Sequence, residues 1–164
     1  MKILMIGPFP PPFNDMTVAN KMIFDGLNVN HKVYLHNTLI SKKIRNVKQM
    51  GKINPKSLLK SAIQIVIGVL KILLFQKLNV IYIAPAQSAN SYLKYIPFMW
   101  TARVRKIPHA IHIHGGYFRK MYDSTSGWKR KIIDKSLKGL AGAIVLGPSL
   151  RYMFEGLMPS YRIE

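Results

Sequence analysis

The residues best suited to chemistry lie at positions 109–116, a short β-branched run with histidines at alternate positions that ends in Gly115 and Gly116. This pattern predicts an interior parallel strand whose last side chain reaches the carboxyl edge of a sheet, where open α/β sheets bind their ligands. Alternation places His112 and His114 on one face of that strand. We expect His112 to be a hydrogen-bonded core histidine. The glycines let a ligand approach closely, so we predict that His114 is a catalytic residue and that Gly115 and Gly116 bind substrate.

A second group of candidates lies in the loop 7–15. Gly7 closes a short apolar run, and four prolines at positions 8–12 stiffen the chain that follows it. Asn14 and Asp15 are good caps for a helix, and a rigid loop followed by a helix N-terminus presents amide donors to a phosphate or carboxylate. We therefore predict that Gly7, Asn14 and Asp15 bind substrate. No G-x-G-x-x-G or P-loop lysine motif is present, so dinucleotide and Walker-type sites lose their main support. An SH3-binding P-x-x-P segment is the alternative for this loop.

Charged residues near the glycines suggest an anionic substrate. Arg119 and Lys120 follow Gly116 closely, and we predict that both contact an anion. The basic residues of a helix expected at 126–137 are better explained as a solvated face. The chain has no cysteine, which excludes thiolate metal sites, and we predict neither a metal nor a resident cofactor.

The overall charge indicates a polyanionic partner. The 164 residues include 25 Lys and Arg against 6 Asp and Glu, for a formal charge of +19. Such an excess is self-repulsive and favours a polyanion, either nucleic acid or anionic lipid. No RNP-like run or helix-turn-helix pattern appears, so we expect an anionic membrane surface and no nucleic acid. The apolar run after Lys2 is too short for a signal peptide, which predicts a cytoplasmic location.

Five apolar runs predict the strands of a single α/β domain: residues 2–7, 31–36, 79–84, 109–114 and 141–147. Between them we expect helices at 14–27, 57–74, 89–103 and 126–137, and a short helix at 150–157. Pro97 should kink or split the third of these helices. Right-handed connections most simply give a parallel sheet in the order 3-2-1-4-5 with strand one central, which brings the loop 7–15 beside His114.

The helix expected at 57–74 is the most apolar stretch of the chain and follows a long basic segment. Lys60, Gln64 and Lys71 recur on one side of it together with Ser57 and Gly68. We expect its wide apolar face to pack against the sheet. The alternatives are that the helix lies partly in a bilayer surface or spans the bilayer.

Four segments together resemble the N-terminal half of a family-four glycosyltransferase with the GT-B fold. They are Ile-Gly-Pro-Phe-Pro-Pro-Pro at 6–12, Thr-Val-Ala-Asn-Lys at 17–21, His-Ile-His-Gly-Gly at 112–116 and Ala-Ile-Val-Leu-Gly-Pro-Ser at 143–149. The resemblance covers the whole chain in the right order. It implies a Rossmann-like, doubly wound domain that binds the acceptor, while a second domain binds a nucleotide sugar. It also implies that transfer retains the anomeric configuration, with His114 next to the reacting sugar.

Two departures from this family qualify the resemblance. Asn14 and Asp15 stand where the family usually has a glycine pair, and the carboxylate there either repels a donor pyrophosphate or caps the helix. The family's two glutamates separated by seven residues have no counterpart, because Glu155 and Glu164 have another spacing. We therefore expect residues 1–164 to be an N-terminal domain that ends before its last strand, without the C-terminal donor domain, and to be inactive alone.

Two functional hypotheses follow. The first is an acceptor domain of a retaining glycosyltransferase that transfers a sugar to a glycan, which the charge and the apolar helix favour as lipid-linked, at the cytoplasmic face of the membrane. The second is a non-catalytic basic α/β module that binds an anionic membrane or a partner protein.

Overall fold

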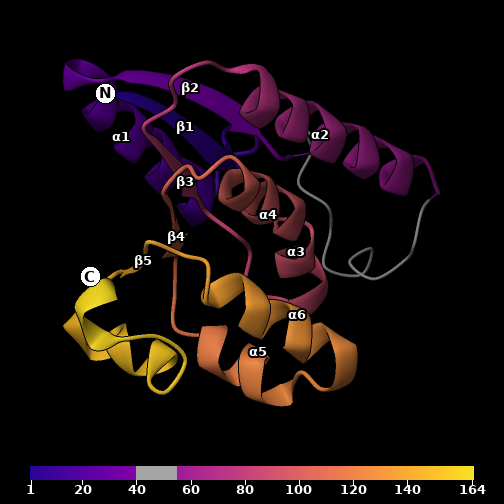
Figure 1. The fold of residues 1–164 in the computed structure, drawn as a ribbon, viewed down its shortest axis with the longest axis vertical. Coiled ribbons are helices and arrows are strands. Elements are labelled where there is room, and N and C mark those ends of the chain that lie inside the picture. Colours follow the sequence, from indigo (N-terminus) through magenta and orange to yellow (C-terminus); the bar gives the residue numbers. More distant parts are fainter. Residues whose placement is uncertain (40–54) are drawn as a thin grey trace.

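A computed structural model describes residues 1–39 and 55–164 as one α/β domain built on a five-stranded, all-parallel sheet (Figure 1). The strands are β1 (Lys2–Gly7), β2 (Lys32–Asn37), β3 (Val80–Ile83), β4 (His109–Ile113) and β5 (Gly142–Val145). The interior strands β1, β3 and β4 are short, largely buried apolar runs, as strands covered on both faces should be, whereas the edge strand β2 is only partly buried. The predicted Rossmann-like, doubly wound fold class is confirmed, with β1 an interior strand.

The predicted strand order is wrong. The sheet runs β2-β1-β3-β4-β5, so β3 lies between β1 and β4 and is itself the central strand. Ile3 of β1 pairs with Val80 of β3, and Ile81 pairs with His109 of β4. After β2 the chain crosses back over β1, so the switch point lies between β1 and β3. Local sequence patterns identify strands, but they do not state on which side of the first strand the second crossover lands.

In residues 1–39 and 55–164, eight helical segments connect and follow the strands. They are α1 (Asp15–Asn30), α2 (Pro55–Leu74), α3 (Ala89–Leu93), α4 (Ile96–Val104), α5 (Phe118–Ser124), α6 (Gly127–Leu137) and the 3-10 helices η2 (Pro148–Phe154) and η3 (Ser160–Arg162). Pro97 lies in the first turn of α4, so the expected split at this proline is confirmed. Helix α5 was not expected from the sequence. The long basic segment that precedes the helix expected at 57–74 falls largely outside the described residues.

Two hydrophobic layers hold the sheet. The larger lies between the sheet and α2, α4 and α6, and the smaller lies under α1 on the opposite face (Figure 1). Ile23, Phe24 and Leu27 of α1 pack toward the sheet, whereas Met22 and Gly26 are exposed. Thr17 and Asn20 are fully buried instead, because both side chains find hydrogen-bond partners at the sheet edge.

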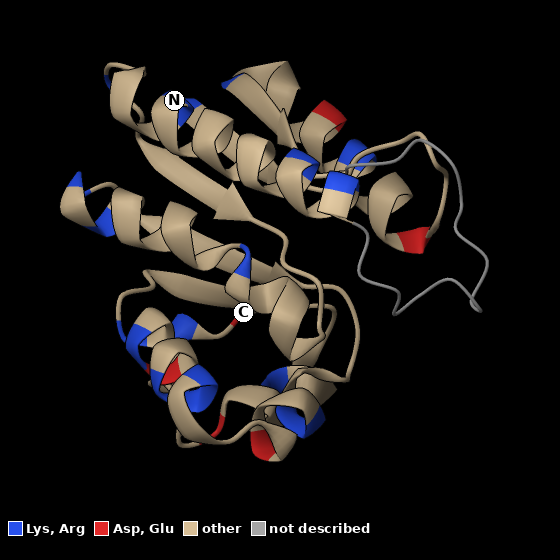
Figure 2. Ribbon diagram, turned by 90° about the vertical axis from the view of Figure 1, so that its right-hand side faces the viewer, with Lys and Arg blue, Asp and Glu red and all other residues tan. Residues whose placement is uncertain are grey.

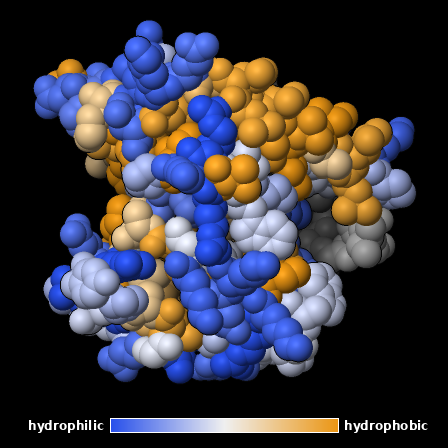
Figure 3. Space-filling model, viewed as in Figure 1, coloured by the Kyte–Doolittle hydropathy of each residue, from blue (hydrophilic) through white to orange (hydrophobic). Residues whose placement is uncertain are grey.

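The side of helix α2 that faces the domain is not the apolar side that the sequence predicted. The side with small and polar residues meets the domain: Ser61 and Gly68 are buried, and Lys71 donates from Nζ to the Leu35 carbonyl at 3.0 Å. Ile65, Val69 and Ile72 border this side and pack against the core. The aliphatic side points outward and forms an apolar stripe over α2 (Figure 3). We call this set the α2 stripe: Leu58, Leu59, Ile63, Val66, Ile67, Leu70, Leu73 and Leu74. The prediction that the apolar face packs against the sheet is therefore wrong.

The reason for this orientation is the closeness of α2 to β2 and α4. A Cβ atom at Gly68 would lie 2.5 Å from a ring carbon of Phe98 and 2.7 Å from Nε2 of His36, so only glycine fits. Arg105 then donates to the carbonyl of Ile72 at 3.0 Å, near the end of the helix. A bulky aliphatic face would hold α2 away from these partners.

We predict that Gly68→Ala destabilises the fold by about 1–3 kcal/mol, because the added methyl overlaps Phe98 and His36. The matched control is Gly26→Ala in α1, where nothing lies within 4 Å of the added Cβ. This control should stabilise the protein by about 0.5–1 kcal/mol through helix propensity. Urea denaturation of both variants measures the two changes, and equal stabilisation by both substitutions would contradict the packing of α2.

Candidate functional site

The loop after β1 is held in place by side chains from β2 and α1. Asn37, at the end of β2, accepts from the Phe9 amide at 3.1 Å and donates to the Phe9 carbonyl at 3.2 Å. Thr17 of α1 donates to the Pro12 carbonyl at 2.8 Å, and Asn14 caps the helix by accepting from the Thr17 amide at 3.0 Å. The Phe9 ring is buried against Phe24. The loop is therefore pre-organised, as its prolines predict.

His114 and the β1 loop meet through Asn20. The Asn20 amide nitrogen donates to the Pro8 carbonyl at 2.9 Å, which directs its Oδ1 toward Nε2 of His114 at 3.0 Å. Because an amide oxygen only accepts, Nε2 of His114 carries a proton. Burial lowers the pKa of His114, so the ring is neutral at pH 7 and its Nδ1 is a bare acceptor. Nδ1 makes no hydrogen bond to any described residue.

His112 lies in the core, as predicted. Its side chain is buried, its Nδ1 shares a short hydrogen bond with the Tyr82 hydroxyl, and its ring stacks on His114 at 4.1 Å between centroids. Burial, with a smaller contribution from His114, lowers the pKa of His112 to about 4. Stacking against His112 fixes the plane of the His114 ring.

Gln87, in the loop after β3, shapes the turn that follows β4. It donates to the His114 carbonyl at 2.7 Å and accepts from the Tyr117 amide at 2.7 Å. Gly115 has a φ of 127°, and a Cβ there would lie 2.8 Å from the Gln87 amide nitrogen. The glycine thus serves both the left-handed turn and the close approach of Gln87.

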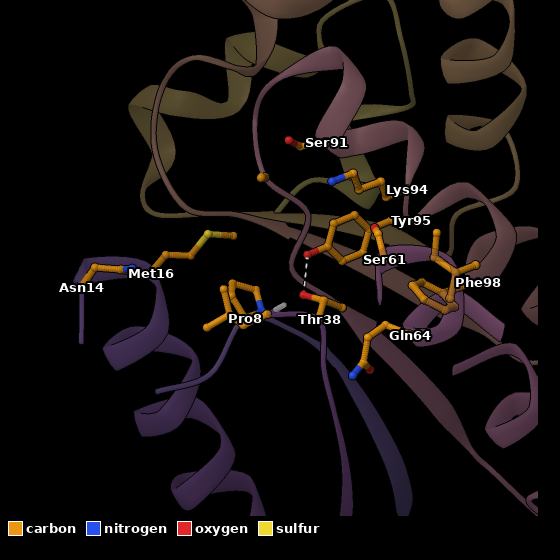
Figure 4. Close-up of a pocket in the computed structure, with 13 residues that line it drawn as sticks. Pro8, Asn14, Met16, Thr38, Ser61, Gln64, Ser91, Lys94, Tyr95 and Phe98 are labelled. Atoms are coloured by element: carbon orange, nitrogen blue, oxygen red, sulfur yellow. Dashed lines mark hydrogen bonds between the residues drawn. The ribbon is translucent and has the colours of Figure 1, made fainter. Parts of the chain in front are cut away.

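A pocket of about 320 Å³ lies at the carboxyl ends of β1, β2 and β3 (Figure 4). Asn14 and Met16 from the start of α1 lie on one side, and Ser61 and Gln64 from α2 on the other. The remaining labelled lining residues are Pro8, Thr38, Ser91, Lys94, Tyr95 and Phe98. The pocket thus combines hydroxyl and amide groups and one cation with aromatic and aliphatic walls, and no carboxylate lines it within the described residues.

The polar floor of this pocket is a pair of hydroxyl groups. Thr38 Oγ1 and the Tyr95 hydroxyl lie 2.9 Å apart, joined by the dashed line in Figure 4. Burial raises the pKa of Tyr95 to about 12, so this hydroxyl keeps its proton at neutral pH and remains both donor and acceptor.

The residues predicted to form one site lie in separate parts of the structure. Asn14 lines the pocket, and Asp15 is exposed in the first turn of α1. Gly7 is buried, with the Ala84 Cβ and the Asn20 amide 3.1 Å from where its own Cβ would be, so it allows close packing. His114 stands on the α1 side and does not line the pocket.

The remaining predicted residues form a second, open hollow of about 540 Å³, lined by Gly116, Arg119 and Lys120 among others. Arg119 is already engaged there, with Asp123 at 2.9 Å and the Glu155 carbonyl at 2.7 Å. Lys120 lies over the Tyr117 ring. An anion at this hollow would therefore meet Lys120 first.

Four residues that shape these sites were not predicted from the sequence: Asn20, Gln87, Thr38 and Tyr95. A polar residue such as Asn20 among the buried positions of an amphipathic helix is a signal that could have been used, because it must find a partner. Gln87, Thr38 and Tyr95 carry no local pattern that marks them. In the part of the chain that the structure describes, no group of three or more His, Asp or Glu side chains could hold a metal ion.

The protein should lose stability in mild acid, because two of its buried histidines resist protonation in the folded state. Burial lowers the pKa of His112 to about 4, and burial together with nearby Lys71 lowers that of His36 to about 4. A histidine in the unfolded chain takes up a proton near pH 6.5, whereas His36 and His112 in the folded protein stay neutral down to about pH 4. The free energy of unfolding should therefore fall between pH 6.5 and about 4 and level off below. We expect a loss on the order of 2 kcal/mol for each histidine, seen in urea denaturation at stepped pH.

Replacing both histidines with glutamine should flatten this pH dependence. Imidazole NMR titration of the unmodified chain provides an independent measurement that needs no variant. Rings of His36 and His112 that titrate near pH 6.5 in the folded protein would contradict their burial.

No protein-family model matches the chain, and the search of curated proteins finds no match either.

Proposed function

We propose that the chain is the acceptor-binding domain of a retaining glycosyltransferase. In this proposal the complete enzyme takes a sugar from a nucleotide-sugar donor and transfers it to a lipid-linked glycan at the cytoplasmic face of the membrane. The observation that carries the proposal is that α2 forms both a wall of the pocket and an exposed apolar surface. Ser61 and Gln64 face the pocket, while Ile63, Val66 and Ile67, which alternate with them, are exposed.

The chemistry of the pocket suits a polyhydroxylated ligand. Hydroxyl and amide groups such as those of Thr38, Tyr95 and Gln64 can both donate to and accept from sugar hydroxyls. Phe98, Ile65 and Met16 contribute apolar wall to the pocket for the C–H side of a sugar ring. A volume of about 320 Å³ lies at the lower end of the range of small-molecule sites and is enough for one or two sugar units.

The lipid part of the acceptor is supported by the α2 stripe. Soluble monomers rarely expose a contiguous apolar patch of this extent, and such patches mark membrane or protein interfaces. Among the described residues, α2 is the one helix that is long and apolar enough to cross a membrane by length and composition. It connects β2 to β3, however, and both strands belong to the same sheet. We infer that α2 lies flat on the bilayer with its stripe in the interface.

The positive net charge also favours binding to an anionic membrane. Lys and Arg outnumber Asp and Glu throughout the ribbon (Figure 2), and Lys60 is exposed beside the stripe. Each cation near an anionic surface contributes about 1 kcal/mol to binding, screened by salt. A lipid-linked glycan held in the pocket would then have its hydrocarbon chain beside the apolar side of α2.

The proposed role of His114 is to orient or deprotonate a reacting hydroxyl. Its neutral ring, fixed by Asn20 and His112, presents an unused acceptor at Nδ1 on the sheet edge. His114 does not line the pocket. In this proposal the reaction is therefore completed outside the pocket, where a second domain supplies the diphosphate contacts that lower the barrier.

The second candidate remains a non-catalytic basic module that binds an anionic membrane, and it rests on the same α2 stripe. It differs from the first in needing no ligand in the pocket. A sugar-bearing amphiphile therefore separates the two proposals.

We predict that dodecyl maltoside, below its micelle concentration, shifts backbone NMR signals at Ser61, Gln64 and Tyr95. Tyr95→Phe removes one hydroxyl of the pocket floor and should weaken binding by about tenfold, as loss of a buried hydrogen bond does. The matched control is Tyr161→Phe, since the Tyr161 ring is 76% exposed and does not line the pocket.

A dodecyl sulfobetaine, which has the same hydrocarbon chain but no sugar, is the ligand control. Equal effects of both amphiphiles, or unchanged affinity in Tyr95→Phe, would contradict sugar recognition and favour the non-catalytic module.

A further inference from the structure

A basic pocket lies at the opposite edge of the sheet from the sugar pocket. It has a volume of about 390 Å³ and opens where β4 and β5 begin and where α4 and α6 end. Four cations line it, each from a different segment: Arg103 on α4, Lys106 just after it, Lys138 at the end of α6 and Arg162 in η3. None of the six acidic residues of the chain is among its lining residues.

These cations have no counter-ion among the residues that the structure describes. The two ion pairs in the described part of the chain, Lys21–Asp25 and Arg119–Asp123, lie elsewhere. Side chains of Arg103, Lys106 and Lys138 make no hydrogen bond to another described residue, and Arg162 makes one long bond of 3.4 Å to the Leu140 carbonyl. His109, buried in the floor, has its pKa lowered first by burial and further by the charge of Arg103.

The backbone holds two of the cations in the pocket. Lys106 adopts a left-handed φ of 53° at the end of α4, a position that glycine fills more readily. Its amide donates to the Arg103 carbonyl at 3.0 Å, and the Ile107 amide donates to the Ala102 carbonyl at 2.9 Å. Arg103 lies over Gly139, with its Cδ 3.3 Å from where a Cβ would be. Lys106 thus occupies a position where glycine would relieve backbone strain. Gly139 lies where a side chain would displace Arg103.

Stabilisation of helix ends explains only part of this arrangement. Arg103 and Lys138 lie at the carboxyl ends of α4 and α6, where cations interact favourably with the helix dipole. Lys106 is strained and Arg162 comes from another segment, and both bring further positive charge into the same pocket. Four converging cations repel one another unless an anion joins them.

We propose that this pocket binds a phosphate-bearing anion. Two arginines supply planar donors that fit phosphate oxygens, and two lysines supply point charges. The phosphate belongs either to a lipid headgroup or to a soluble ligand. Val104 and Trp100, which flank Arg103 on α4, are 79% and 40% exposed, and this apolar rim favours the headgroup. The site lies away from the sugar pocket and does not rest on the proposed function.

The test uses Lys106→Gly, with Lys77→Gly as its matched control. Lys77 is the other non-glycine residue with a left-handed φ in the described chain, at 62°, and it does not line the pocket. Both substitutions remove one positive charge and relieve the same backbone strain, so both should raise the thermal midpoint. Pyrophosphate affinity, measured calorimetrically at fixed salt, should fall about tenfold in Lys106→Gly and stay unchanged in Lys77→Gly.

A second measurement identifies the source of the phosphate. Phosphatidylcholine vesicles with and without phosphatidylglycerol are sedimented with each variant. A loss specific to Lys106→Gly on the anionic vesicles assigns the site to a lipid headgroup, and a loss confined to pyrophosphate assigns it to a soluble ligand. Equal behaviour of the two variants with every probe would overturn the proposal, since net charge alone would then account for the binding.

Discussion

The contact between Gly68 of α2 and the His36–Phe98 pair decides how this domain meets its surroundings. Because only a hydrogen fits between the helix and these rings, the side of α2 that carries small and polar residues faces inward. Most aliphatic side chains of α2 then lie on its outer side and remain exposed, while Ile65, Val69 and Ile72 pack against the core. The same packing brings Ser61 and Gln64 to the pocket beside Thr38 and Tyr95. One close contact thus produces both the proposed sugar pocket and the proposed membrane surface.

Unbalanced positive charge is the second constraint. With a formal charge of +19 and two ion pairs in the described chain, most cations are not neutralised by acidic partners. Some serve the fold, as Lys71 does at the Leu35 carbonyl and Arg105 at the end of α2. Others gather at the edge where β4 and β5 begin, in the basic pocket. The distribution places an apolar face and an anion site on neighbouring surfaces, as an interface with anionic lipid requires.

The fold class was predictable because its signals are local. Apolar runs followed by loops located the strands, Pro97 marked the break between α3 and α4, and alternation correctly placed His112 in the core beside His114. Contacts between segments far apart in sequence were not predictable in this way. The order of β1, β3 and β4 depends on where a crossover lands, and the buried side of α2 depends on Phe98, some thirty residues beyond Gly68. Asn20 and Gln87 hold His114 and its loop through bonds that no local pattern encodes.

Entry of the exposed side of α2 into a bilayer surface can be measured directly, because the chain has no cysteine and a single one can be introduced for labelling. A spin label attached to Ile67→Cys, on the stripe, is compared with one on Met22→Cys, which is exposed on α1 across the sheet. With vesicles containing phosphatidylglycerol, the account predicts that the label at position 67 becomes accessible to oxygen and shielded from a water-soluble nickel relaxant, while the label at position 22 stays in water. Equal exposure of both labels to the nickel reagent on vesicles that bind the protein would contradict it.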